Sequence, residues 1–130
     1  MQALPFLLVA AGGALGSALR YGVSLMLVRE DLRAGFPWAT FAVNVVGSFF
    51  LGMVAESLVG RRVFGVDARV VVGTGLLGGF TTYSSFNLET LGLIDAGEHG
   101  RAGLYVGATL VVCLMAGLLG LYAGKAIRGA

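Results

Sequence analysis

A glycine- and hydroxyl-rich stretch, residues 73–86, holds most of the groups in this sequence that could do chemistry in apolar surroundings. It reads Gly-Thr-Gly-Leu-Leu-Gly-Gly-Phe-Thr-Thr-Tyr-Ser-Ser-Phe. Serine and threonine hydroxyls donate hydrogen bonds without carrying a charge, and the ring edges of Tyr83 and Phe86 carry positive electrostatic potential. Such groups could replace the hydration shell of a small anion. We therefore expect this stretch to form the functional centre.

The same residues are poor material for the interior of a helix. Glycine loses backbone entropy when it becomes helical, and Ser and Thr hydroxyls compete for the hydrogen bonds of the helix backbone. In a bilayer, the freed N–H and C=O groups must be satisfied by protein or by a polar cavity. We therefore predict a membrane helix that is broken at mid-membrane and faces a site. The freed carbonyls would suit a small cation.

Polar residues recur every four positions in two other apolar stretches. Thr40, Asn44 and Ser48 form one series, and Tyr105, Thr109 and Cys113 form another. This spacing places each series along one face of a helix. Asn44 is the most informative member, because its amide offers two donors and one acceptor. We predict that Asn44 lines a polar path; the alternative is an interhelical hydrogen bond that holds the bundle together.

The composition places these residues in a membrane. Of the 130 residues, 57% are hydrophobic and only 12% are charged, and the mean hydropathy is +0.88; a soluble domain has about 25% charged residues. The charges fall in short clusters between apolar stretches of about 20 residues, the length that crosses a bilayer. We predict an all-α membrane protein with a single four-span domain over residues 1–130. The expected spans are 4–28, 37–59, 69–94 and 103–124.

The first span lacks a basic segment before its apolar run, so we expect it to be retained and not cleaved as a signal peptide. Two small-residue patterns predict close helix packing in lipid: Gly12 and Gly16 in the first span, and Ala116, Gly120 and Gly124 in the fourth.

Two of the charged residues within the predicted spans bear on the site, Arg20 and Glu89. Arg20 should face a polar cavity or extend its side chain to the interface. Glu89 lies near the end of the third span, where we expect a solvated vestibule position. Lys and Arg are spread almost evenly between the two ends of the predicted bundle, so the termini are only weakly assigned to the cytoplasm, and insertion in both orientations is allowed.

The sequence lacks the motifs and flanking elements that other functional classes require. Gly73-x-Gly75-x-x-Gly78 resembles a dinucleotide-binding loop, but it is flanked by bilayer-length apolar segments and not by a βαβ unit. The sequence contains no phosphate-loop lysine, nucleophile elbow or metal-ligand spacing that would indicate an enzyme. It also lacks the basic patch that a nucleic-acid partner would require.

Three segments together resemble the Fluc (CrcB) family of fluoride channels. They are residues 12–21, residues 41–47 around Asn44, and residues 78–86. The resemblance implies an antiparallel, dual-topology homodimer with two fluoride pores in the inner (plasma) membrane. Passive export of fluoride would protect the cell from its toxicity.

The resemblance also implies roles for individual residues. Asn44 would be the pore asparagine, and Tyr83 and Phe86 would be the two pore aromatics. The backbone carbonyls of Gly78 and Thr81 would hold a structural Na⁺ ion, and Arg20 and Glu89 would lie in vestibules. The remaining expected pore residues are Thr40, Ser48, Thr82, Ser84, Ser85, Tyr105, Thr109 and Cys113.

Two positions depart from the family pattern: Tyr83 replaces a usual phenylalanine, and Cys113 replaces a usual hydroxyl residue. Two other functions stay open on the sequence alone. One is a small proton-coupled exporter of organic cations that uses Glu56 or Glu89 as its coupling carboxylate. The other is a non-transporting membrane scaffold held together by its glycine faces.

Overall fold

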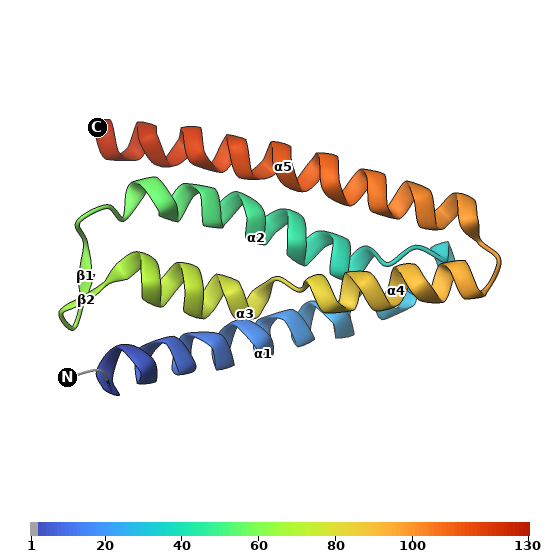
Figure 1. Ribbon diagram of the computed structural model, residues 1–130, viewed down its shortest axis with the longest axis horizontal. Coiled ribbons are helices and arrows are strands. Elements are labelled where there is room, and N and C mark those ends of the chain that lie inside the picture. The colour runs from blue at the N-terminus through green and yellow to red at the C-terminus, as the bar shows by residue number, and fades with distance from the viewer. Residues whose placement is uncertain (1–2) are drawn as a thin grey trace.

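The helices lie side by side along the long axis of the molecule (Figure 1). The computed structural model describes residues 3–130. The continuous helices are α1 (Ala3–Ala34), α2 (Trp38–Ser57) and α5 (His99–Gly129). Within residues 3–130, these three helices are long and apolar enough to cross a membrane. The prediction of an all-α membrane protein is therefore confirmed.

The remaining segment is divided into three pieces. It begins with η1 (Val70–Leu77), continues as the short helix α3 (Gly78–Phe80), and resumes after two residues as α4 (Tyr83–Asp95). Thr81 and Thr82 between them are extended, with ψ angles of 158° and 113°. The break that the glycines and hydroxyls predict is thus present, at Thr81–Thr82.

The backbone of η1 is a π-helix, which the sequence did not indicate. The i to i−5 hydrogen bond of a π-helix is present at the C-terminal end of η1, where the Gly78 N–H donates to the Gly73 carbonyl. π-Helical turns are rare and often occur near functional sites. Here the π-helix leads directly into the break.

Glycines let the helix backbones approach closely, as the two small-residue patterns predict. A Cβ atom added to Gly16 in α1 would collide with the backbone of Leu76 and would lie 2.8 Å from the Phe80 nitrogen. A Cβ atom on Gly120 in α5 would collide with the Phe49 carbonyl of α2. The glycines of α1 and α5 thus bring α1 against η1 and α3, and α5 against α2.

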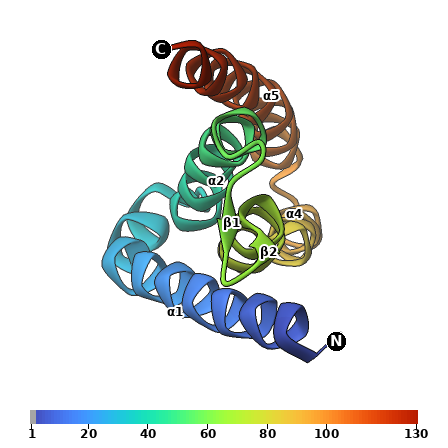
Figure 2. The ribbon, with the colours of Figure 1, turned by 90° about the vertical axis from the view of Figure 1, so that its left-hand side faces the viewer.

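A small hairpin closes the connection between α2 and η1. Strands β1 (Arg62–Val63) and β2 (Val66–Asp67) pair antiparallel, with Arg62 opposite Asp67. Phe64 and Gly65 have positive φ angles of 48° and 81°, which suits a two-residue type I′ turn. The sequence predicted only a connection between two spans here, without strands. The hairpin lies at the same end of the bundle as both termini (Figures 1 and 2).

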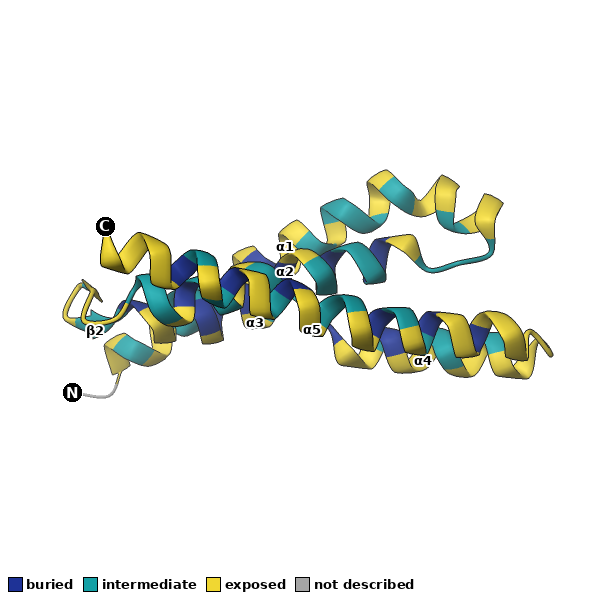
Figure 3. Ribbon diagram, turned by 90° about the horizontal axis from the view of Figure 1, so that it is seen from above, coloured by how far each residue is buried: buried dark blue, intermediate teal, exposed yellow. Residues whose placement is uncertain are grey.

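Much of the outer surface is apolar. Burial is concentrated along the middle of the bundle (Figure 3), whereas large side chains such as Phe6, Met26 and Leu114 are 71–81% exposed. Extended apolar surface of this kind marks contact with membrane or protein. The outer faces are therefore suited to lipid or to another protein chain.

The α2–α5 contact can be tested at a single glycine. We expect Gly120→Ala to lower the free energy of unfolding by about 1–3 kcal/mol, because the new methyl group must push α2 and α5 apart. Thermal unfolding in detergent, followed by circular dichroism, measures the change. Gly107→Ala in the same helix is the control, because a Cβ atom there meets nothing within 4 Å. Equal effects of the two substitutions would contradict the packing.

Candidate functional site

Asn44 of α2 is hydrogen-bonded to the chain at its break. Its Nδ2 donates to the Thr82 carbonyl at 3.0 Å, and its Oδ1 accepts from the Thr82 N–H at 2.8 Å. One side-chain amide thus satisfies both backbone groups of a residue that lies outside helical geometry. Because Nδ2 carries two hydrogens, one N–H can donate to a further acceptor.

The hydroxyl of Thr82 starts the helix that follows the break. Its Oγ1 accepts from the Ser85 N–H at 3.1 Å and donates to the Ser85 Oγ at 3.1 Å. The Ser84 Oγ lies 3.2 Å from the same oxygen. Thr82 is therefore the N-cap of α4. The hydroxyls that the sequence singled out therefore lie together, and the Thr82 hydroxyl accepts a hydrogen bond from the backbone of its own helix.

These side-chain contacts divert two backbone donors. In an uninterrupted helix, the Thr82 N–H would donate to the Gly78 carbonyl and the Ser85 N–H to the Thr81 carbonyl. Here the Thr82 N–H donates to Asn44 and the Ser85 N–H to the Thr82 hydroxyl. The carbonyls of Gly78 and Thr81 are thereby released from their helical donors. Neutral carbonyl oxygens are suitable ligands for a small hard cation.

Arg20 supports the other side of the break. Its Nε donates to the Gly79 carbonyl at 3.1 Å, and the Ser17 hydroxyl donates to the same oxygen at 3.4 Å. A cation at the C-terminal end of a helix is favourable, so Arg20 acts as a side-chain cap of α3. The sequence predicted that Arg20 faces a polar cavity or vestibule or extends to the interface, and it did not indicate this contact.

A groove runs beside the break, and we call it the break groove. It encloses about 370 Å³. Its polar and aromatic lining residues are all ones that the sequence analysis singled out: Asn44, Ser48, Thr81, Thr82, Tyr83, Phe86, Thr109 and Cys113. Within residues 3–130, the buried Oγ1 of Thr109 has no hydrogen-bond partner. The groove therefore contains uncharged donors that an entering ligand could use.

Glu89 lies in a second cluster, which we call the mouth cluster. Its Oε1 accepts from the Thr40 hydroxyl and its Oε2 from the Tyr105 hydroxyl, both at 2.6 Å. Bonds of this length are typical of a hydroxyl that donates to an ionised carboxylate. The expected solvated vestibule position of Glu89 stays a prediction, because the residue also lines a cavity of about 330 Å³. The carboxylate is half-buried, because α4 packs against α5 and near the start of α2.

Aromatic rings join the break groove to the mouth cluster. The Tyr83 and Phe86 ring centroids are 5.8 Å apart, and those of Phe86 and Tyr105 are 5.1 Å apart. Tyr105 is completely buried, whereas Tyr83 is 78% exposed at the open side of the groove. Thr40 and Tyr105, which the sequence grouped with the groove residues, belong to the mouth cluster.

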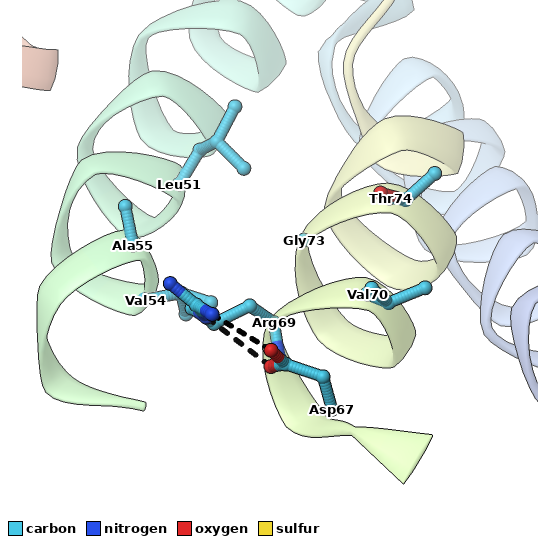
Figure 4. A pocket seen from close by; sticks show the side chains of 8 residues that line it. All are labelled: Leu51, Val54, Ala55, Asp67, Arg69, Val70, Gly73 and Thr74. Atoms are coloured by element: carbon cyan, nitrogen blue, oxygen red, sulfur yellow. Dashed lines mark hydrogen bonds and ion pairs between the residues drawn. The ribbon is translucent and has the colours of Figure 1, made fainter. Parts of the chain in front are cut away.

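A cavity of about 460 Å³ lies apart from these residues, between α2 and η1 (Figure 4). Its walls are mostly apolar, and its polar edge is the ion pair between Arg69 and Asp67, with an N–O distance of 2.7 Å. Hydrogen bonds from the Arg69 side chain and backbone lower the pKa of Asp67 to about 2. This ion pair lies next to the hairpin, because Asp67 is the last residue of β2.

We expect Asn44→Leu to destabilise the protein strongly, because it leaves the Thr82 N–H and carbonyl without partners. Each unsatisfied buried group costs about 1–3 kcal/mol. Denaturant unfolding in detergent measures the loss. Asn87→Leu, at an exposed position of α4, is the matched control and should change stability far less. Equal stability of the two variants would contradict the structural role of Asn44.

Comparison with known proteins places this arrangement in context. The sequence profile of the family described as "CrcB-like protein, Camphor Resistance (CrcB)" matches residues 7–121. A protein of Thermus thermophilus named "Fluoride-specific ion channel FluC" is 47% identical over 124 residues, which cover 95% of this chain and 98% of that protein. Proteins of the same name from Opitutus terrae and Agrobacterium fabrum are 50% and 44% identical, over 88% and 91% of this chain and 88% and 94% of their own lengths.

Proposed function

The chain belongs to the CrcB-like family, and from this premise we infer that it is a fluoride-specific ion channel. The observation that carries the inference is the break groove, where uncharged donors surround a helix break braced by Asn44. The activity is conduction through a membrane and not catalysis.

The chemistry of fluoride fits such a lining. Fluoride is small and strongly hydrated, so it crosses only where closely placed donors replace its water, and it leaves only if no single site holds it too tightly. In this proposal the second N–H of Asn44, the hydroxyl of Thr109 and the ring edges of Tyr83 and Phe86 provide successive weak sites. Ser48 and Cys113 complete the lining, and Ser84 and Ser85 lie next to it, beside the Thr82 hydroxyl. A narrow path of this kind disfavours the larger chloride ion.

The mouth cluster would form one end of the path. Thr40 and Tyr105 both donate to Glu89, so an arriving anion must compete with this carboxylate for the two hydroxyls. We propose that Arg20 acts mainly by holding the break, with its charge also favouring anions nearby. Fluoride would flow passively out of the cell. The negative potential inside the cell drives the anion outward across the inner membrane.

We further propose that the working unit is an antiparallel homodimer with two pores. One chain leaves the break groove open, with Tyr83 and Leu114 exposed by 78% and 71%; a second copy could cover these side chains and close each path. The difference in basic residues between the two ends is small, and it is compatible with both orientations. One end carries Arg61, Arg62, Arg69, Lys125 and Arg128, and the other carries Arg29, Arg33 and Arg101.

A structural Na⁺ ion would be held by the Gly78 and Thr81 carbonyls. The donor set fits, because both oxygens lose their helical N–H partners at the break. When bound, the ion would supply a fixed positive charge where the two copies meet. Asn44 and Thr82 would keep the carbonyls available by holding the diverted N–H groups.

The direct test is fluoride efflux. Liposomes that contain the protein and potassium fluoride should release fluoride when valinomycin is added, as measured with a fluoride electrode, whereas chloride-loaded liposomes should release little chloride. Tyr83→Phe should also conduct, within about tenfold of the parent rate, because the electropositive ring edge is retained.

Protein-free liposomes provide the baseline for this assay. Efflux at that baseline from the parent protein would refute the channel. An inactive parent that becomes active as Tyr83→Phe would refute the proposed equivalence of the two rings. Equal release of fluoride and chloride would refute the selectivity.

Removal of sodium tests the cation site. Exchange of Na⁺ for N-methylglucamine should lower the thermal midpoint of the dimer, because a bound ion stabilises the state that holds it. A titration of the midpoint against Na⁺, with K⁺ at equal ionic strength as control, measures the effect. A midpoint that is the same in all three cations would count against a sodium site.

A further inference from the structure

Phe36 lies in the short connector between α1 and α2, outside every segment that the sequence analysis assigned to the pore. Its neighbours fix its position. Gly35 has a φ of 59°, and its N–H donates to the Asp31 carbonyl at 2.9 Å. The Asp31 carboxylate in turn accepts from the Ala39 N–H at 3.2 Å. The connector is therefore held at both of its ends.

The Phe36 ring packs directly on the mouth cluster. Its centroid is 5.2 Å from that of Tyr105, with an interplanar angle of 81°, an edge-to-face arrangement that aromatic pairs favour. Tyr105 is completely buried, and its hydroxyl donates to Glu89. Phe86 lies 5.1 Å from Tyr105 by ring centroids. Phe36 thus extends the series of rings that begins at Tyr83.

Phe36 also borders open space. A cavity of about 330 Å³ is lined by Phe36, Asp31, Gly35, Pro37 and Glu89, together with three residues of α1 and α4. The ring therefore borders this cavity and also packs on the buried ring of Tyr105. A shorter, non-aromatic side chain would leave one side of the Tyr105 ring without its packing partner.

We propose that Phe36 is a positioning residue for conduction. Its ring holds Tyr105 so that the phenol hydroxyl stays directed at the mouth cluster. There, fluoride must replace Glu89 as the acceptor of the hydrogen bond from this hydroxyl. The proposal rests on the fluoride-channel function. It gives the α1–α2 connector a role in fluoride conduction. The residue type of Phe36 and its position in the sequence do not indicate this role.

The test compares Phe36→Leu with Phe41→Leu. Phe41 belongs to the same aromatic group, with its ring 5.8 Å from that of Phe36, and it makes a matched control for lost aromatic packing. Phe36→Leu should slow fluoride efflux about three- to tenfold, the effect expected from losing one aromatic pair. Phe36→Tyr, which retains the ring, should conduct within about twofold of the parent, and so should Phe41→Leu.

A second readout reports on Tyr105 itself. In protein labelled with ¹³C at tyrosine Cζ, the Tyr105 resonance is identified by its loss in Tyr105→Phe. Solid-state NMR in bilayers should show this resonance shifted in Phe36→Leu and unshifted in Phe41→Leu. This measurement does not depend on whether Tyr105→Phe still conducts.

The proposal requires both effects together. Unchanged efflux in Phe36→Leu, an unshifted Tyr105 resonance, or equal effects of Phe36→Leu and Phe41→Leu would each overturn it. Parent efflux in the same vesicles separates this result from the channel itself: a conducting parent with any of these outcomes leaves the fluoride channel standing and removes only the role of Phe36.

Discussion

The amide of Asn44 supplies the two hydrogen bonds that Thr82 needs where the third helical segment is interrupted. At 2.8 and 3.0 Å, these bonds satisfy the N–H and the carbonyl of a residue whose backbone lipid could not satisfy. Without them, an extended residue inside an apolar bundle would carry an unpaired donor and acceptor. The break, the groove beside it and the released carbonyl of Gly78 depend on this one pairing, whereas the Thr82 hydroxyl releases the carbonyl of Thr81 by accepting the Ser85 N–H.

Close helix packing and uncharged hydrogen-bond donors surround that pairing. Glycines bring α1 within backbone contact of η1 and α3, which lets Arg20 reach the Gly79 carbonyl and support the break from the opposite side. On the α2 side, hydroxyls and ring edges line the groove. In the proposed path, a fluoride ion would meet only uncharged donors along the groove and then the like-charged carboxylate of Glu89, an arrangement that disfavours tight binding.

The sequence predicted the break and the groove lining, because both follow from local residue type. Glycine and hydroxyl residues indicate a weak helix wherever they cluster, and the spacing of four residues placed Asn44 with Ser48 and Thr109 with Cys113. The sequence did not predict features set by tertiary packing. The burial of Glu89 depends on where α4 meets α2 and α5, and the Arg20 contact depends on how closely α1 approaches α3. The π-helix of η1 and the two-residue strands of the hairpin have no distinctive sequence pattern.

The second N–H of the Asn44 amide offers the most direct measurement of the account. Solid-state NMR of the protein labelled with ¹⁵N at asparagine, in bilayers, reports on both hydrogens of Nδ2. The account predicts that added fluoride shifts one Asn44 Nδ2 hydrogen while the hydrogen bonded to the Thr82 carbonyl stays in place, and that equal chloride shifts neither. If fluoride leaves both hydrogens unchanged, or shifts them no more than chloride does, then Asn44 braces the chain without contacting the ion, and the central claim is wrong.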